Sequence, residues 1–259
     1  MFDFMQICTT SMNCQKPRQF RWALLCLTII AISCNKGPDF VTKYGDEITI
    51  TKEVKGNGTL FVSQKFDLYL LQDRSQKEFI QITYGSNLVD KITAEVEDGV
   101  FKVKDQNKYN WVRNLNVRPR CTLNLHSLQN LHLEGTSNLT CLDSIQTSNL
   151  SIKMDGVGVH SLKVNCGSIS GSCSNSGGIA FSGRGGLFAW SCEDGGWIDA
   201  SNMYSDDVYF YHYTDRDVFI NPNVILVSYV YGNGNVFYKK KPWMKFEIKE
   251  TGNGKVIQK

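Results

Sequence analysis

The chain has 259 residues, of which 42% are hydrophobic and 20% are charged, a balance typical of a globular protein and unlike that of a disordered, fibrous or multi-spanning membrane protein. Its formal net charge of +3 provides no basic stripe for a phosphate backbone, so we expect no nucleic-acid partner. Gly is abundant (22 residues) and Pro is scarce (5 residues), and long apolar helical periodicities are missing. These features predict an all-β protein with many turns.

A signal for export lies near the start of the chain. Lys16, Arg18 and Arg21 lead into a short apolar run, Trp22–Ile32, and a small residue follows it. A basic segment, an apolar segment and a small residue at a cleavage point make up a secretory signal, and the run is too short for a membrane-spanning helix of about 20 residues. The sequence therefore predicts a cleaved signal peptide over residues 1–33, with Met5 or Met12 as alternative start positions.

The end of the apolar run predicts a lipid anchor. The order Ala31-Ile32-Ser33-Cys34 resembles the lipobox of bacterial lipoproteins, in which the signal is cut before a Cys that receives acyl chains. We expect Cys34 to be lipidated, residues 34–39 to hold this anchor and a short linker, and the protein to be exported and tethered to the outer membrane. The alternative is an ordinary signal peptide that happens to end near a Cys. Residues 40–259 would form the folded domain.

Five cysteines follow Cys34 in the sequence. They are Cys121, Cys141, Cys166, Cys173 and Cys192. An odd number without a close CxxC pair argues against a zinc site and against a simple disulfide framework, although an exported protein could hold one or two bridges. We expect most of them to be small apolar core residues.

Short alternating segments recur from Leu131 onward, with turns rich in Gly, Asn, Asp and Ser between them. Two strand series share a period near 20 residues, which is typical of a solenoid whose coils must stack to bury their apolar faces. The first series is Leu139, Val159, Ile179, Trp197, Val218, Val236 and Val256. The second series is Leu131, Leu150, Ile169, Leu187, Val208, Leu226 and Phe246. We predict a right-handed parallel β-helix, irregular over residues 40–125 and regular over residues 126–259; a meander sandwich is the alternative.

Two similar corners occur near the end of the chain. Gly232-Asn233-Gly234 and Gly252-Asn253-Gly254 lie 20 residues apart, and each comes shortly before a Val. We expect the same corner to be built twice, with the glycines supplying the positive φ of a sharp turn. Neither segment has the pattern of a phosphate-binding loop.

These residues also carry a resemblance to a known family. The segment Val224–Lys259 contains YVYGNGNVFYKKKP, ending in Pro242, and then FEIKETGNGKV. With the strands before it, this segment resembles the putative auto-transporter adhesin head GIN domain family, and the resemblance covers residues 40–259. The strands that follow the family's order are Phe66–Leu71, Phe79–Tyr84, Gly99–Val103 and Leu128–Gly135. The resemblance implies a secreted or lipid-anchored β-helix of a Gram-negative envelope with a role in adhesion.

Alternation along the second series predicts an aromatic outer surface, because successive strand side chains point to opposite faces. Strands one coil apart lie about 4.8 Å apart, so Trp190, Tyr211 and Tyr229 would stack in one ladder and Tyr213 and Tyr231 in another. Flat aromatic rings with polar edges suit a sugar ring or a protein partner. The complete candidate binding surface is Trp190, Tyr209, Tyr211, Tyr213, Tyr229 and Tyr231.

Two structural alternatives compete with this surface. Residues 40–125 could pack over it, or the faces could be inverted in these coils, which would place the aromatic residues in the core. Large exposed apolar patches usually have a function, but they also arise where two parts of one protein pack together.

The sequence contains no established catalytic pattern. The four histidines (His126, His132, His160 and His212) show no metal-ligand spacing, and no GxSxG segment occurs. Carboxylates in the β-helix could in principle act on a polysaccharide, but most lie at expected turns, where Asp commonly bonds to its own backbone. The candidates are Glu193, Asp194, Asp199, Asp206, Asp207, Asp215 and Asp217.

The sequence as a whole favours a non-catalytic envelope lipoprotein that binds a glycan or a surface protein. We expect no catalytic residues, no metal site and no cofactor, and a contact with the membrane through the lipid anchor alone. A polysaccharide lyase or hydrolase on the same scaffold is the first alternative, and a purely structural envelope protein is the second.

Overall fold

The computed structural model describes residues 43–108 and 117–259. The predicted signal peptide, Cys34 and the linker lie outside the described residues. Across the two described ranges, no helix has both the length and the apolar character needed to cross a membrane.

Strands make up nearly all of the regular structure in the described ranges. A 3₁₀ turn, η2 (Val89–Lys91), lies between β4 and β5. The strands are β1 (Glu47–Glu53), β2 (Gly58–Val62), β3 (Asp67–Leu71), β4 (Phe79–Gly85), β5 (Ile92–Glu97), β6 (Val100–Asp105), β7 (Arg120–Asn124), β8 (Leu128–Gly135), β9 (Asn138–Cys141), β10 (Ile145–Gly156), β11 (Val159–Cys173), β12 (Gly178–Cys192), β13 (Trp197–His212), β14 (Val218–Ile220), β15 (Pro222–Val230), β16 (Val236–Tyr238), β17 (Lys245–Glu250) and β18 (Val256–Gln258).

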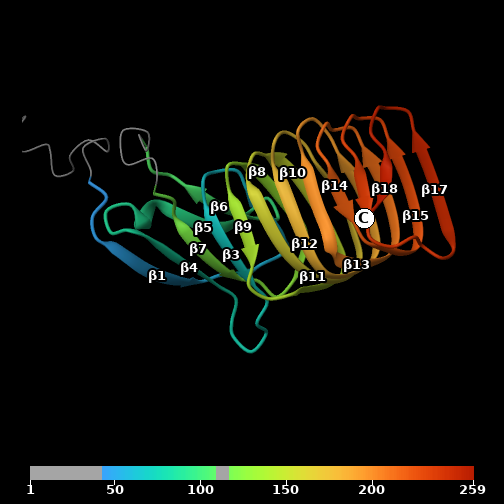
Figure 1. Cartoon of the computed structure of the whole chain (residues 1–259). Coiled ribbons are helices and arrows are strands. Elements are labelled where there is room, and N and C mark those ends of the chain that lie inside the picture. The colour runs from blue at the N-terminus through green and yellow to red at the C-terminus, as the bar shows by residue number, and fades with distance from the viewer. Residues whose placement is uncertain (1–42, 109–116) are drawn as a thin grey trace, which may run out of the picture. The chain divides into compact units, whose positions relative to one another are not determined.

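The strands from β8 onward stack in parallel, coil upon coil (Figure 1). One column of register partners is separated by 19, 20, 18 and 20 residues. Its members are Ile169, Phe188, Val208, Leu226 and Phe246. The structure thus confirms the predicted all-β solenoid with coils of about 20 residues.

Pairing is mixed among the earlier strands. β1 with β4, β4 with β7, and β5 with β6 form antiparallel pairs. β2 and β3 pair in parallel with β8 and β9, so they form part of the solenoid wall. In Figure 1 this mixed region and the last coil, β17 and β18, lie at opposite ends of the stack.

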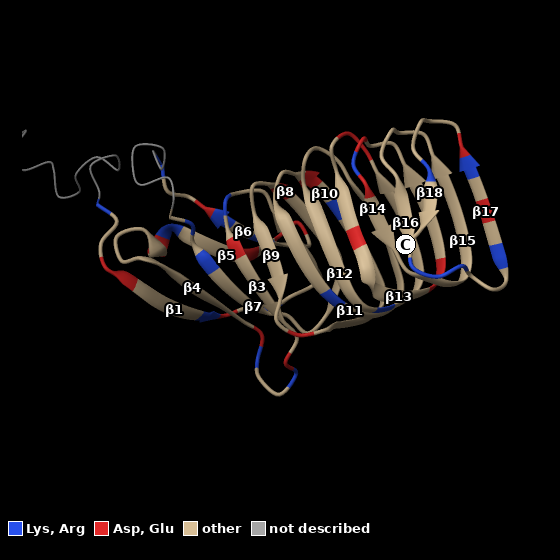
Figure 2. Ribbon diagram, in the orientation of Figure 1, with Lys and Arg blue, Asp and Glu red and all other residues tan. Residues whose placement is uncertain are grey.

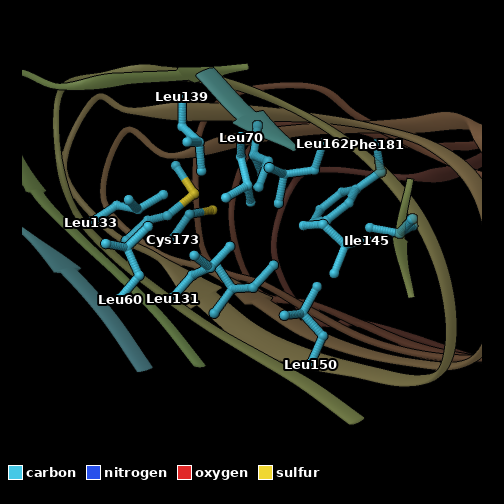
Figure 3. Packing of buried hydrophobic residues seen from close by; sticks show 14 of the residues in the cluster. Leu60, Leu70, Leu131, Leu133, Leu139, Ile145, Leu150, Leu162, Cys173 and Phe181 are labelled. Carbon is cyan, nitrogen blue, oxygen red and sulfur yellow. The ribbon is translucent and has the colours of Figure 1, made fainter. Parts of the chain in front are cut away.

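The core is the narrow interior that the coils enclose. Side chains from opposite walls point into it, as Leu139, Leu162 and Phe181 do toward Leu131 and Leu150 (Figure 3). A solenoid coil has no core of its own, so each apolar side chain is covered by its equivalents in the coils before and after it. The cohesion of the fold therefore depends on correct stacking.

Three members of the predicted strand series were wrong by one residue: the actual register partners are His160, Ile198 and Phe188, in place of Val159, Trp197 and Leu187. Leu131 was wrong by two residues, because its partner is Ile152 and not Leu150. A displacement of one residue exchanges the inner and outer faces of a strand. For β12 this exchange has consequences for the candidate binding surface, described below.

The two Gly-Asn-Gly corners stack as predicted, since Val236 and Val256 are register partners. The reason for their glycines differs from the prediction, because positive φ occurs elsewhere and not at these four glycines. A Cβ at Gly234 would instead meet the carbonyl oxygen of Arg216, and one at Gly254 would meet that of Gly234. Glycine is needed here so that backbones of successive coils can approach closely.

A ladder of polar side chains ties these corners together. Asn253 Nδ2 donates to Asn233 Oδ1 (2.8 Å), and Asn233 Nδ2 donates to Asp215 Oδ1 (2.6 Å). Beside it, the backbone N–H of Asn235 donates to Asp217 Oδ1 (2.8 Å). Asp215 and Asp217 therefore accept hydrogen bonds that connect the corners of successive coils.

Candidate functional site

Five tyrosines form an outward-facing surface on two successive coils, called here the tyrosine face. Tyr209, Tyr211 and Tyr213 lie on or just after β13, and Tyr229 and Tyr231 lie on or just after β15. Four of them are exposed, Tyr213 most of all at 47%, and Tyr229 is half-buried. Within residues 43–108 and 117–259, neither the N-terminal strands nor an inverted face hides the four exposed tyrosines.

The rings stack in two ladders, because equivalent residues of parallel strands lie directly above one another. Tyr211 and Tyr229 are register partners, with ring centroids 5.2 Å apart and planes inclined by 7°. Tyr213 and Tyr231 stack at 4.7 Å and 4°. The predicted pairing of these four rings is confirmed, and together with Tyr209 they give a flat aromatic surface with hydroxyl groups at its edges.

Trp190 does not belong to this surface. The prediction placed it above Tyr211, but Ser191 is the register partner of Tyr211, and Trp190 is paired with Phe210 inside the solenoid. Trp190 is only 2% exposed and packs against Phe188, with ring centroids 5.6 Å apart. The one-residue displacement in β12 turns Leu187 outward and Trp190 inward.

Charged groups border the tyrosine face on the coil that follows. Glu247 accepts a hydrogen bond from the Tyr229 hydroxyl (3.3 Å) and pairs with Lys245 (2.8 Å). The negative charge of Glu247 raises the pKa of Tyr229, and partial burial raises that of Tyr213. Both hydroxyls therefore remain protonated at neutral pH and can donate hydrogen bonds.

An open hollow lies at the other end of the tyrosine face. Glu193 and Asp194 line it together with Tyr213, and its volume is about 430 Å³. Asp194 occupies a positive-φ corner, with φ of 53°. A ligand lying across the rings would meet carboxylates beside Tyr213 and the Lys245–Glu247 pair near Tyr229.

A second concave region lies on another face of the coils and was not predicted from the sequence. Phe219 and Phe237 stack there with centroids 5.2 Å apart, and the Lys259 ammonium sits 4.8 Å from the Phe219 ring. The groove has a volume of about 380 Å³, and Asp199 and Lys239 also line it. The first strand series contained the signal, since both Phe residues follow one of its members directly.

The carboxylates weighed as catalytic groups are dispersed over the fold. Asp206 lies 3.3 Å from Arg184, and Asp199 accepts a hydrogen bond from the backbone N–H of Ser201 (3.0 Å). As described above, Asp215 accepts a hydrogen bond from the side chain of Asn233, and Asp217 accepts one from the backbone N–H of Asn235. Figure 2 shows acidic and basic residues interspersed along the described strands, without a long stripe of one sign.

One mixed cluster lies outside the tyrosine face. His132 and Glu134 on β8 meet Asp155 on β10, with ligand atoms within 4.8 Å of one another. Lys153 Nζ lies 2.6 Å from Asp155 Oδ2, so a metal ion at this cluster would have to displace the Lys153 ammonium group. No spacing in the sequence could have predicted this group, because the stacking of the coils brings its members together from two separate strands.

Two of the histidines belong to the core. His160 and His212 are 2% and 0% exposed, and burial lowers the pKa of both. His212 Nε2 lies 2.8 Å from the carbonyl oxygen of Arg216, so its ring helps to hold a corner. These contacts give both residues a structural role.

Comparison with solved structures places the fold among bacterial adhesin-like proteins. A putative adhesin from Bacteroides fragilis is 20% identical with a TM-score of 0.76, covering 83% of this chain and 97% of that chain. Putative adhesins from Parabacteroides distasonis (16% identity, TM-score 0.63, 82% and 98% coverage) and Parabacteroides merdae (17%, 0.62, 84% and 98%) are also similar. At such low identities, the TM-scores show a shared fold alone. No curated protein is significantly similar to the chain.

The sequence pattern that defines one family matches residues 58–242, which is most of the chain. It includes the strands from β2 to β16, and with them all five residues of the tyrosine face. The match confirms the predicted family over residues 58–242, which include the first Gly-Asn-Gly corner but not the second. The chain belongs to the family described as putative auto-transporter adhesin, head GIN domain.

Proposed function

We propose that this protein is a non-catalytic adhesin of the cell envelope that holds a glycan or a surface protein against the tyrosine face. The observation that carries the proposal is the pair of stacked, exposed ladders, Tyr211 with Tyr229 and Tyr213 with Tyr231. Monomeric proteins seldom expose grouped aromatic rings without a partner for them. Rigid rings also lose little conformational entropy on binding.

A glycan suits this surface best. Sugar rings stack on flat aromatic faces, and their hydroxyl groups can bond to the protonated Tyr hydroxyls and to the carboxylates beside them. Glu193, Asp194 and Glu247 lie at the two ends of the ladders, where they could bond to such hydroxyls. A protein partner would use the same rings as buried anchors, and the binding experiment below separates the two.

Replacing one ring in each ladder should weaken binding and leave the fold intact. We expect the double variant Tyr211→Ser, Tyr231→Ser to bind at least about tenfold more weakly, equivalent to about 1.4 kcal/mol. Tyr204→Ser is the matched control, because Tyr204 is equally exposed at 39% but lies outside the tyrosine face. Binding of residues 35–259 to a glycan array and to envelope protein fractions measures the effect, with thermal unfolding as the check on folding.

The outcomes of this comparison are distinct. Glycan binding that is lost in the double variant and kept in Tyr204→Ser supports the proposal. Equal losses in both variants would contradict it. Turnover of the same polysaccharides in reducing-sugar and lyase assays would favour the enzymatic alternative, and binding confined to protein fractions would favour a protein partner.

We further propose that Cys34 anchors the protein to the outer membrane. Cys34→Ser should release the protein from the membrane fraction and remove the mass of the acyl chains, because one acyl chain already contributes about 0.8 kcal/mol per buried CH₂ group. Cys141→Ser, a change within the folded domain, should remain membrane-bound. Fractionation and intact mass measure both. An unchanged distribution of Cys34→Ser would rule out this anchor.

A further inference from the structure

Two cysteines face each other in adjacent coils of the core. Cys173 is the last residue of β11 and Cys192 is the last residue of β12, and the two are register partners. Both side chains point inward and are fully buried. Stacking of the coils therefore brings together two residues that are far apart in the chain.

Their sulfur atoms are 2.9 Å apart. Unbonded carbon atoms pack at about 3.5–4.0 Å, and sulfur is larger than carbon. Two thiols at this distance are crowded, and a bond of about 2.05 Å would remove the crowding. The backbone geometry permits it, since adjacent strands lie about 4.7–4.9 Å apart and bridged cysteines have Cα atoms about 4.4–6.8 Å apart.

The other thiols have different surroundings. Cys166 directs its sulfur to the carbonyl oxygen of Ile145 (3.6 Å). Burial raises the pKa of Cys121 and of Cys141 to about 12, so both stay protonated. The pKa of Cys173, by contrast, is lowered, chiefly by a hydrogen bond from Cys192. The short sulfur–sulfur contact therefore identifies Cys173 and Cys192 as the pair that can be bridged.

We propose that Cys173 and Cys192 form a disulfide that cross-links two adjacent coils of the solenoid. A disulfide of an envelope thiol oxidoreductase, or oxidised glutathione in vitro, is the oxidant. One of the two cysteines attacks it as the thiolate and releases one thiol of the oxidant, and the other cysteine then attacks the mixed disulfide and releases the second. The two cysteines lose two electrons and two protons in total, and the oxidant's disulfide is reduced to two thiols.

This bond must form before the coils close, because neither sulfur is accessible in the folded protein. Once formed, it restricts the unfolded chain across one coil of the solenoid. Elsewhere the coils are held together by non-covalent contacts. The disulfide would add a covalent connection between two of them, β11 and β12. The proposal does not depend on the tyrosine face or on its ligand.

A peptide map without reduction tests the bond. The full chain is purified from the envelope without reductant, unfolded in the presence of a thiol-alkylating reagent, and digested. We expect the Cys173 and Cys192 peptides to be linked, with a mass two hydrogens below their sum, and the Cys121, Cys141 and Cys166 peptides to be alkylated. In Cys192→Ser the Cys173 peptide should become alkylated, whereas Cys166→Ser should keep the link.

Thermal unfolding gives a second measurement. Reductant present during unfolding should lower the Tm of the wild type and of Cys166→Ser by about 5–10 °C and leave that of Cys192→Ser unchanged. Full alkylation of both Cys173 and Cys192, even after refolding with oxidised glutathione, would overturn the proposal. Release of a bound soft metal ion on unfolding, with both thiols free, would overturn it as well.

Discussion

Replacing Trp190 by Ala should lower the free energy of unfolding by about 3–5 kcal/mol, the usual cost of removing a large aromatic residue from a packed core. Trp190 fills the interior between β11 and β13, with the Phe181 ring edge-on at 5.4 Å and the Phe188 ring stacked at 5.6 Å. Gly171, its register partner, makes room for the indole, since a Cβ there would lie 2.8 Å from Trp190 Cζ3. Gly171 has no side chain, so it cannot fill the cavity that Trp190→Ala would leave.

Denaturant unfolding of two variants and a control checks this expectation. Trp190→Phe should lose much less stability than Trp190→Ala, because it keeps most of the side-chain volume in the core. Tyr211→Ala, on the tyrosine face, should change stability by no more than about 1 kcal/mol. Similar losses in Trp190→Ala and Tyr211→Ala would show that the register of β12 differs from that described here.

The error over Trp190 has a definite cause in the sequence. Leu187, Phe188, Ala189 and Trp190 are consecutive and all apolar, so alternation cannot tell which of them face inward. The preceding half of β12 contains Gly183, Gly185 and Gly186, which have no side chains to fix the phase. The period of the repeat predicted the position of β12 in the chain, but it did not show which face of this strand points inward.

Elsewhere the same reasoning succeeded because polar residues marked the outer face. In β13, Val208, Phe210 and His212 alternate with the exposed tyrosines, and the Tyr211 and Tyr213 ladders follow from that phase. Contacts between coils were harder to predict. The register between coils varies by one or two residues. Both the cluster of His132, Glu134 and Asp155 and the Cys173–Cys192 pair depend on this register. A repeat period known only to within one or two residues cannot predict which side chains meet.

Acidification should destabilise the protein by about 3 kcal/mol between pH 6.5 and pH 4 through His160 alone. Burial lowers the pKa of His160 from 6.5 to about 4, and one pKa unit corresponds to about 1.4 kcal/mol. His160 lies in the core between Leu139 and Ile179, and its Nδ1 has no hydrogen-bond partner. In the folded protein a charge at this position would be buried without compensation.

The sign follows from the proton balance. Below pH 6.5 the His160 ring is protonated in the unfolded chain, but in the folded chain it stays neutral down to about pH 4. Falling pH therefore favours unfolding between pH 6.5 and pH 4, and His160 causes no further loss of stability below pH 4.

The variant His160→Leu tests this expectation, because Leu matches the Leu and Ile of the adjacent coils and cannot titrate. Urea unfolding at pH 7, 5.5 and 4.5 should therefore give a shallower pH dependence for His160→Leu than for the wild type. The pH dependence that remains in His160→Leu would come from His212, whose pKa is also lowered by burial, and from the carboxylates. Identical slopes in the two proteins would mean that the imidazole of His160 reaches water and that its coil is more open than the register of β9, β11 and β12 implies.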